Sequence, residues 1–382
     1  MLTQNRAGSL VKNLSGECSY FSFSPAPLPP NPPIAFDEEL ISLLVSAHRK
    51  LVALNLISTN IPDMPLFISM YVRKEALMSA QIEGSQVTLD DLLNPNAYES
   101  TNINIKEVVN YVKAYEFALE KLNELPICNR LLKDTHYILM SGVRGCDKDP
   151  GEFRQSQNWI GDQGSTLKTA SFIPPNKNDM HAALSDLEKY INSDDNLDVI
   201  IQAALIHYQF ETIHPFLDGN GRVGRLLIIL FFIQKGILSN PVLYISYFLK
   251  KNRMEYYDRL INVRKNGHFE EWIKFFLRAV SESAEDAMEK IKKLTKLHIT
   301  NINKIRGTGL LKKNLTRLLV YLEMHPIINT QQTALDLNLA FSTTSSMIKA
   351  LLDLKILVGS ESQRNRIYYY HDYLEMLKDG TL

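Results

Sequence analysis

Cysteine, net charge and long apolar runs are all scarce in this 382-residue chain. Three cysteines, Cys18, Cys128 and Cys146, show no metal-type spacing, and so low a count is typical of a reducing cytoplasm. Lys plus Arg and Asp plus Glu each number 42, so no global charge draws the chain to nucleic acid or to an anionic membrane. The longest apolar run, at 226–233, is far shorter than the ~20 residues that span a bilayer.

These absences disfavour a membrane protein, a disulfide scaffold and a cysteine-rich zinc module. The first residues lack a basic region followed by an apolar core, so no export signal is expected and we expect a cytoplasmic protein without a membrane partner. Hydrophobic residues make up 45% and charged residues 22% of the chain, which is ordinary globular usage. The length allows two or three domains.

Helical periodicity dominates the body of the chain. Apolar residues recur every three to four positions over 108–122, 180–191 and 200–210. We therefore predict a mainly α fold, a helical bundle with an N-terminal helical region over 37–110 and a core over 111–290. Residues 226–233 are apolar all round and predict a central buried helix that ends near Gly236.

Two segments depart from the helical pattern. Residues 1–36 carry six prolines between positions 25 and 33, which predicts a stiff, extended N-terminal arm. At 151–175, two short strand-like pieces flank a Gly/Asp turn, which predicts a β-hairpin. An exposed hairpin edge has two uses: it can cap the bundle, or it can pair with an extended segment of another protein.

The C-terminal residues 308–382 predict a separate winged helix-turn-helix domain, joined by a linker over 291–306. Helices are expected at 315–323, 330–337 and 342–354, with Asn329 and either Ser342 or Thr343 as N-caps, before a strand–turn–strand tail. The would-be recognition helix has one lysine, Lys349, and the wing adds Arg364 and Arg366. That is few basic contacts for DNA, so protein contact or support of a homodimer is preferred and DNA contact is left open.

The residues with chemistry lie in one loop, His214-Pro-Phe-Leu-Asp-Gly-Asn-Gly-Arg-Val-Gly-Arg225, between two predicted helices. Gly219, Gly221 and Gly224 spell the dinucleotide pattern G-x-G-x-x-G, but a helix precedes them where that pattern needs a strand. The loop also fails as a P-loop, because Arg225-Leu226 stands where Lys-Ser/Thr is required.

A phosphate-binding loop remains the best interpretation. Gly219 and Gly221 let a ligand approach the backbone, and the N–H groups there lead into a helix N-terminus that attracts anions. Arg222 and Arg225 share one helix face and can bind neighbouring phosphates. A lone carboxylate, Asp218, suits Mg²⁺ that takes its other ligands from phosphate and water. His214 titrates closest to neutrality and is the natural proton acceptor.

The loop resembles the signature of the Fic family, H-P-F-x-[DE]-G-N-G-R-x-x-R, at every fixed position. The resemblance covers about 37–290 and implies an all-helical core with a β-hairpin flap, here 158–173, that aligns a target protein. Most members transfer AMP from ATP to a Ser, Thr or Tyr hydroxyl. By this resemblance His214 is the base, Asp218 binds Mg²⁺ and Phe216 anchors the loop. The implied nucleotide-binding set is Gly219, Asn220, Gly221, Arg222, Val223, Gly224, Arg225 and Tyr257, with Tyr256 as the second choice for the nucleoside position.

A second motif predicts control of the loop. Residues 69–83 read as a helix with Gly84 as its cap, so the Glu83 carboxylate would face the negative helix end, which is unfavourable by ~0.3–1 kcal/mol without a nearby cation. The sequence Ser79-Ala-Gln-Ile-Glu83-Gly84 resembles the family's inhibitory motif. By that resemblance Ser79 and Glu83 form the inhibitory pair, and Glu83 engages Arg225.

Several alternatives stay open. His207, on an apolar helix face, is interpreted as a core histidine, while Ser165 and Thr166 in the flap turn are candidates for self-modification. Glu83 is a candidate for helping to remove AMP as well as for inhibition, as in some relatives. An alternative from another class is a nucleotide-sensing transcriptional regulator that uses the C-terminal domain. The target protein, the modified residue and the trigger are not determined by the sequence.

Overall fold

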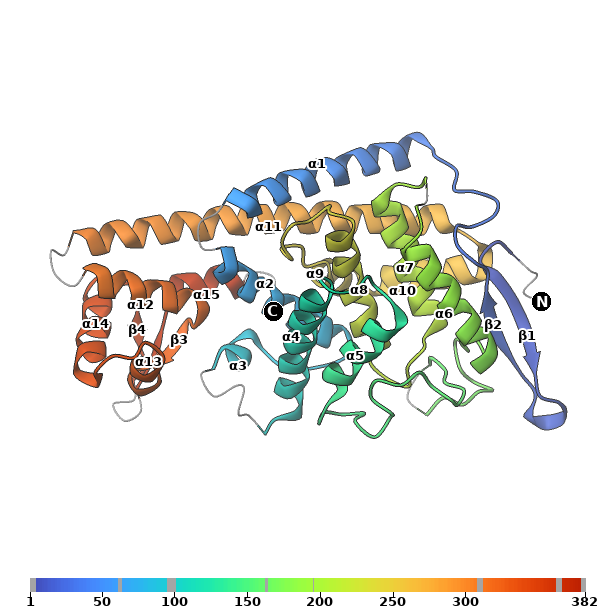
Figure 1. Ribbon diagram of the computed structural model, residues 1–382, viewed down its shortest axis with the longest axis horizontal. Coiled ribbons are helices and arrows are strands. Elements are labelled where there is room, and N and C mark those ends of the chain that lie inside the picture. The colour runs from blue at the N-terminus through green and yellow to red at the C-terminus, as the bar shows by residue number, and fades with distance from the viewer. Residues whose placement is uncertain are drawn as a thin grey trace.

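The computed structural model describes residues 5–60, 64–94, 101–161, 164–194, 196–307, 312–361 and 366–378. It is mainly helical, as predicted. The central helices are α4 (Ile103–Lys121), α5 (Asn129–Met140), α6 (Lys177–Ile191), α7 (Val199–Ile213) and α8 (Asn220–Gln234), shown in Figure 1. The periodic segments 108–122, 180–191 and 200–210 lie within α4, α6 and α7 apart from Leu122, which caps α4.

Helices α7 and α8 form the centre of the core. Both are buried on nearly every side, because their apolar residues run all round the helix rather than along one stripe. The side chain of Asp198 caps α7 by accepting a hydrogen bond from the Ile200 N–H, and Gly236 follows α8 with φ 69°, as the predicted stop requires. The interpretation of His207 holds: it is fully buried, with its two ring nitrogens 3.0 Å from the Gly224 carbonyl and 2.9 Å from the Tyr256 hydroxyl.

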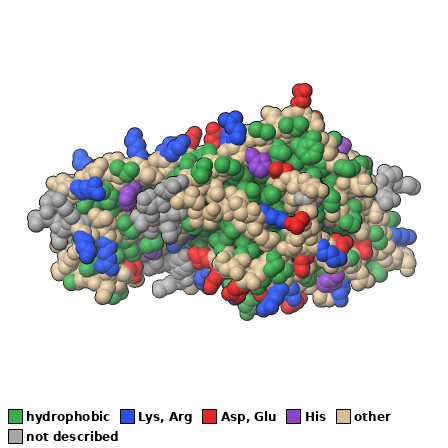
Figure 2. Space-filling model, turned by 45° about the horizontal axis from the view of Figure 1, so that its top comes forward, with side chains coloured by type: hydrophobic (Ala, Val, Ile, Leu, Met, Phe, Trp, Pro, Cys, Tyr) green, Lys and Arg blue, Asp and Glu red, His purple; other side chains and the backbone are tan. Residues whose placement is uncertain are grey.

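Two long helices, α1 (Glu38–Asn60) and α11 (Phe269–Arg306), lie side by side along one edge of the molecule (Figure 1). Residues Glu38–Thr59 of α1 are long and apolar enough to cross a membrane by length and composition, with 22% of that window buried. One face of α1, with Leu40, Ala47, Leu51 and Leu54, is fully buried. Apolar side chains lie among the lysines and arginines of the outer surface in Figure 2, and those exposed on α1 are Ile41, Val45, Val52 and Leu56.

The N-terminal segment corrects the prediction of an extended arm. Strands β1 (Gly8–Asn13) and β2 (Tyr20–Pro25) form an antiparallel hairpin around a short 3-10 turn (η1, Gly16–Cys18). Only the residues after it, with the prolines, run without regular structure to α1. The prolines dominated the prediction, but the strands form before most of them, in stretches with aromatic and β-branched residues such as Val11, Tyr20 and Phe23.

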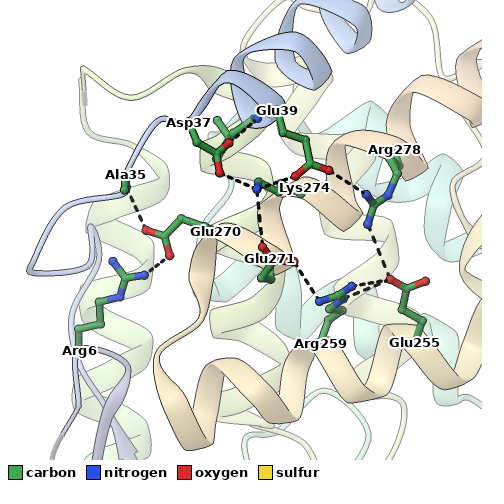
Figure 3. A network of polar contacts seen from close by, with 11 residues as sticks. Arg6, Ala35, Asp37, Glu39, Glu255, Arg259, Glu270, Glu271, Lys274 and Arg278 are labelled. Carbon is green, nitrogen blue, oxygen red and sulfur yellow. Dashed lines mark hydrogen bonds and ion pairs between the residues drawn. The ribbon is translucent and has the colours of Figure 1, made fainter.

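Ion pairs attach this N-terminal segment to α11, and α10 (Arg253–Asn266) pairs with α11 in the same network, as Figure 3 shows. Arg6 pairs with Glu270, which also accepts a hydrogen bond from the Ala35 N–H. Lys274, whose side chain is only 7% exposed, binds Asp37 and Glu39 at 2.6 and 2.7 Å. The network therefore fixes the start of α1 against α11.

The remaining helices of the body surround the core. They are α2 (Met64–Ile82), α3 (Leu89–Leu93) and α9 (Ser246–Lys251). Helix α2 packs against α4, α8, α9 and α12 (Lys312–Met324), so it lies between the core and the C-terminal residues.

The C-terminal elements follow the predicted order. After α12 come β3 (Ile327–Asn329), α13 (Thr330–Asp336), α14 (Phe341–Asp353), β4 (Val358–Gly359), β5 (Ile367–Tyr369) and α15 (His371–Lys378). The strands form one antiparallel sheet in the order β3-β5-β4. Asn329 caps α13 as predicted, but α14 starts one residue early, after Ala340, so neither Ser342 nor Thr343 is its N-cap. Arg364 of the predicted wing lies outside the described residues.

The predicted linker over 291–306 is wrong, because α11 continues unbroken through it to Arg306. Its polar composition concealed a helical stripe: Ile291, Leu294 and Ile305 are fully or almost fully buried on one face, while Lys292, Lys293 and Lys296 point to solvent. A helix therefore occupies the stretch over 291–306 that the sequence predicted as a linker.

Replacing Thr300 by proline tests this continuity. Thr300 is exposed on α11, and proline there removes the N–H that bonds one turn back and clashes with that turn, at a local cost of about 3 kcal/mol. We expect amide hydrogen exchange over 291–306 to speed up strongly in Thr300→Pro and to stay slow in the control Thr300→Ala. Equal exchange in the two variants would show that this stretch is not helical in solution.

Candidate active site

The loop between α7 and α8 brings the predicted residues together through two left-handed positions. Helix α7 ends at Ile213, His214 takes φ 50° and ψ 60°, and Gly219 takes φ 77° directly before α8 begins at Asn220. A positive φ is unusual for histidine, and neighbouring donors hold it: the Arg154 Nε and the Asn158 Nδ2 donate to the His214 carbonyl at 3.0 and 3.1 Å.

Asn220 holds the loop closed. Its side chain is 2% exposed, accepts a hydrogen bond from the Phe216 N–H and donates one to the Phe216 carbonyl, both at 2.8 Å. The amide side chain is thereby used within the loop, so Asn220 can serve an anion only through its backbone N–H. That N–H, with those of Gly221 and Arg222, belongs to the first turn of α8, before the first helical bond from Val223 to Gly219.

His136 is a supporting residue that the sequence analysis missed. Its ring stacks on Phe216 with centroids 3.8 Å apart and a 7° angle. Its Nε2 lies 3.0 Å from the Asp218 carbonyl and its Nδ1 accepts from the Gly151 N–H, which places the proton on Nε2. Burial lowers the pKa of His136 to about 4, so the ring is neutral. Nothing in the local sequence of α5 distinguishes it from a core histidine.

Both carboxylate oxygens of Asp218 have polar neighbours. Its Oδ1 accepts from the Gly219 N–H at 2.6 Å, and its Oδ2 lies 3.3 Å from the Lys148 Nζ. The side chain is about one third exposed. Among the described residues no group of three or more His, Cys, Asp or Glu can hold a metal ion. A hard cation that takes its remaining ligands from phosphate and water still fits the partly exposed carboxylate of Asp218.

Arg222 is buried, 6% exposed, and reaches across the loop. Its Nη2 lies 3.2 Å from the Met140 Sδ and 3.6 Å from the Asp218 Oδ1, while its Nε is buried without a partner among the described residues. A buried guanidinium with an unused donor is suited to an anionic ligand.

Arg225 has its donors engaged by the end of α2. The side chain is 1% exposed; its Nη2 donates to the Glu83 Oε1 at 2.8 Å and to the Ser79 carbonyl at 3.0 Å, and its Nε donates to the Ser79 Oγ at 2.8 Å. The contact expected between Glu83 and Arg225 is therefore present in the geometry, and Ser79 takes part through two atoms.

The end of α2 fixes where the Glu83 carboxylate lies. Gly84, at φ 94°, donates to the Gln81 carbonyl, and Ser85 donates to the Ala80 carbonyl, which is the paired pattern of a Schellman cap. A Cβ added to Gly221 would lie 2.4 Å from the Glu83 Oε1, so the carboxylate rests on the first turn of α8. Glu83 thus occupies the anion position that the helix N-terminus creates.

The surroundings set the charge states of His214 and Glu83. Burial, and then the cations Arg264 and Arg154, lower the pKa of His214 to about 4, so its imidazole is neutral near pH 7. Desolvation opposes ionisation of Glu83, but the guanidinium of Arg225, helped by Arg222, holds its pKa below the ordinary value. The site therefore holds a neutral base beside a fixed carboxylate.

The flap forms only a minimal hairpin in the described residues, which omit 162–163. Ile160 and Phe172 exchange two backbone hydrogen bonds, at 2.8 and 3.1 Å. At its base the Asn158 Nδ2 donates to the carbonyls of His214 and Phe216, which joins the flap to the loop. The Phe23 N–H donates to the Ile173 carbonyl, so the N-terminal hairpin lies beside the flap. Ser165 and Thr166 lie in the turn, where the Trp159 indole donates to the Ser165 carbonyl.

The two candidate tyrosines differ in exposure. Tyr256 is buried and its hydroxyl bonds His207, so it belongs to the core. Tyr257 is 37% exposed, with Arg253 against its ring, and the charges of Glu83 and Arg225 act on it. Tyr257 is therefore the one that a ligand at the loop can reach.

Replacing Asn220 by alanine tests the closed loop. The variant leaves the buried Phe216 N–H without its partner, which costs ~1–3 kcal/mol, while the Phe216 carbonyl keeps the hydrogen bond from the Asn158 Nδ2. We expect a lower urea midpoint for Asn220→Ala and no more than a small change for Asn266→Ala, an exposed asparagine at the end of α10. An unchanged midpoint for Asn220→Ala would contradict the role of its side chain.

Two family models match the chain. The Fic/DOC family N-terminal model covers residues 41–120 and the Fic/DOC family model covers 126–232. The chain is 32% identical over 141 residues to the protein adenylyltransferase Fic of Drosophila erecta, a match over 36% of this chain and 24% of that protein. It is 27% identical over 180 residues to a probable protein adenylyltransferase of Aquifex aeolicus (strain VF5), over 45% of this chain and 51% of that protein. The matches thus span about a quarter to a half of these relatives.

Solved structures share the fold at low sequence identity. A Fic family protein from Desulfovibrio desulfuricans G20 superposes with a TM-score of 0.56 at 17% identity, over 88% of this chain and 97% of that one. A Fic domain-containing signalling protein from Bacteroides thetaiotaomicron VPI-5482 gives 0.51 at 17% identity, over 66% and 97%. With the family models on both the α2 region and the loop, the chain belongs to the Fic/DOC family.

Proposed function

We propose that this protein is an ATP- and Mg²⁺-dependent protein adenylyltransferase that moves AMP from ATP to a Ser, Thr or Tyr hydroxyl of a target protein. The observation that carries the proposal is the combination of a neutral His214 with the first turn of α8 and with the buried Nε of Arg222, which bonds no residue in the described part of the chain. The names of the relatives, protein adenylyltransferases, support it.

The reaction is a displacement at the α-phosphorus of ATP. The target hydroxyl oxygen forms the new bond, the bond from the α-phosphorus to the bridging oxygen breaks, and pyrophosphate leaves. His214 takes the hydroxyl proton. The N–H groups of Gly219, Asn220 and Gly221 would bind the α-phosphate, where charge builds up, with Arg222 and Arg225 on the leaving phosphates and Val223 and Gly224 continuing the turn. Bound at Asp218, Mg²⁺ would supply charge neutralisation of the phosphates.

The geometry of His214 agrees with this role. Its Nδ1 lies 3.4 Å from the Glu211 carbonyl, an acceptor, which favours the tautomer with the proton on Nδ1. The Nε2 lone pair is then free for the substrate proton. Since the pKa is about 4, the ring is in its basic form across the physiological range.

Loss of His214 tests the enzyme. We expect His214→Ala to slow transfer of label from α-phosphate-labelled ATP to protein by ~10²–10⁴-fold, and the exposed control His371→Ala to leave it unchanged. Nucleotide binding without covalent label, in the unmodified protein and in Glu83→Gly alike, would instead favour a nucleotide-sensing regulator that uses the C-terminal elements.

We further infer that Glu83 and Ser79 inhibit this reaction. Their hydrogen bonds occupy Nε and Nη2 of Arg225, and the Glu83 carboxylate takes up the anion position on α8. A nucleotide can then bind, but its terminal phosphate cannot reach Arg225 without displacing Glu83. Self-modification at Ser165 or Thr166, and removal of AMP from a modified protein with the help of Glu83, stay candidate activities of the same site.

Substitution of Glu83 tests the inhibition. A charge-assisted hydrogen bond contributes ~1.5–3 kcal/mol, so we expect Glu83→Gly to raise transfer roughly tenfold or more. Glu83→Gln keeps an acceptor oxygen but loses the charge, and should give a smaller rise. Glu375→Gln, at an exposed carboxylate of α15, is the control. Equal self-labelling by Glu83→Gly and the unmodified protein would refute the inhibitory role.

The partners follow from the surface of the site. A target segment would dock on the flap over 158–173, next to His214. All three cysteines are free, which agrees with a reducing cytoplasm as the place of the reaction. The C-terminal elements offer a surface for a protein partner or a second copy more readily than for DNA, since α14 carries a single lysine, Lys349.

A further inference from the structure

Arg264, on α10, joins three parts of the site and has no role in the function proposed above. Its side chain lies among the buried residues, 7% exposed. Its Nε donates to the Thr212 Oγ1 at 3.1 Å and its Nη2 donates to the Glu211 carbonyl at 3.2 Å, both in the last turn of α7. Its guanidinium carbon lies 3.9 Å from the centre of the Phe172 ring on the flap.

Arg264 and His214 share one acceptor. The Glu211 carbonyl receives the Arg264 Nη2 at 3.2 Å and lies 3.4 Å from the His214 Nδ1. The carbonyl that selects the tautomer of His214 is therefore held by Arg264. Through Phe172, which exchanges two backbone hydrogen bonds with Ile160, the same guanidinium also contacts the flap.

We propose that Arg264 is a positioning residue that orients the His214 imidazole, keeps its proton on Nδ1 and fixes the flap at a set distance from it. The proposal rests on the proposed role of His214 as the base. A target segment that pairs with the flap would then present its hydroxyl to a base whose place is fixed by the flap itself.

The position requires arginine rather than any cation. The planar guanidinium stacks on Phe172 through its face while its edge donates to Glu211 and Thr212. A lysine ammonium is a point charge and cannot do both at once. The Arg264 guanidinium is also shielded from water, which strengthens its electrostatic contacts.

Four charged or titratable groups act on His214 from the elements around it. Arg264 of α10 and Arg154 of the loop before the flap disfavour the imidazolium, while Glu83 beyond α2 favours it. Glu211 lies on α7 itself, and burial raises its pKa to about 7, so near neutral pH it carries only part of a negative charge. Removal of the Arg264 charge should therefore raise the pKa of His214 toward its ordinary value near 6.5.

The test reads His214 directly by ¹⁵N NMR of the full chain with labelled histidine, where the spectrum of His214→Ala identifies its signals. In the unmodified protein we expect His214 to stay neutral, with its proton on Nδ1, down to about pH 5. In Arg264→Gln, His214 should titrate at higher pH and show both tautomers. In Arg264→Lys, His214 should keep its low pKa but still show both tautomers. Arg259→Gln, on the same helix in the surface ion-pair network, should match the unmodified protein.

Self-labelling in the Glu83→Gly background adds a kinetic readout. Arg264→Gln should lower the maximal rate at least tenfold at pH 7 with unchanged half-saturation by ATP, and should shift the acid limb of the pH profile upward. An unchanged pKa and an unchanged tautomer of His214 in Arg264→Gln would overturn the proposal. If that variant does not fold, a single tautomer of His214 in Arg264→Lys would overturn it. If the Glu83→Gly variant transfers no AMP, the proposed function fails, and NMR still decides the role of Arg264.

Discussion

The site depends on one constraint, the short bend between two buried helices that turns the carbonyl end of α7 toward the N–H end of α8. The two ends carry opposite partial charges a few residues apart. Arg154 and Arg264 donate to the carbonyl end, while the N–H end attracts an anion. Burial and these two arginines keep His214 neutral, and the partial positive charge at the start of α8 favours an anion beside it.

The Glu83 carboxylate fills that place in the absence of a nucleotide. It satisfies the same two requirements that a phosphate would, since it lies on the first turn of α8 and binds a guanidinium. Helix α2 fixes the position of this carboxylate. The buried Glu75 of α2 accepts a hydrogen bond from the Ser246 N–H, and Gln81 of α2 accepts one from the Lys250 Nζ. The proposed inhibition would need no separate domain, because a single carboxylate at a helix end would imitate a phosphate.

Much of the fold could be predicted because its signals are local. Periodicity located α4, α6 and α7, and the glycines and arginines between 214 and 225 identified the loop. The failures were also local in origin. A polar composition concealed the end of α11, and prolines drew attention away from the β1–β2 hairpin. In both cases the side chains that decide the structure are the few that meet a partner distant in sequence.

The sequence alone determined the chemistry of the loop and the order of its residues, because a turn with its cap, glycines and helix N-terminus is encoded within a dozen positions. Only the tertiary structure decided which residues surround it. Four residues contact the loop or the end of α7 from more than 50 positions away in the sequence: His136, Lys148, Arg154 and Arg264. Nothing in their local sequence marks them. Their roles arise from burial and contact, which depend on how helices pack, and packing is a property of the whole chain.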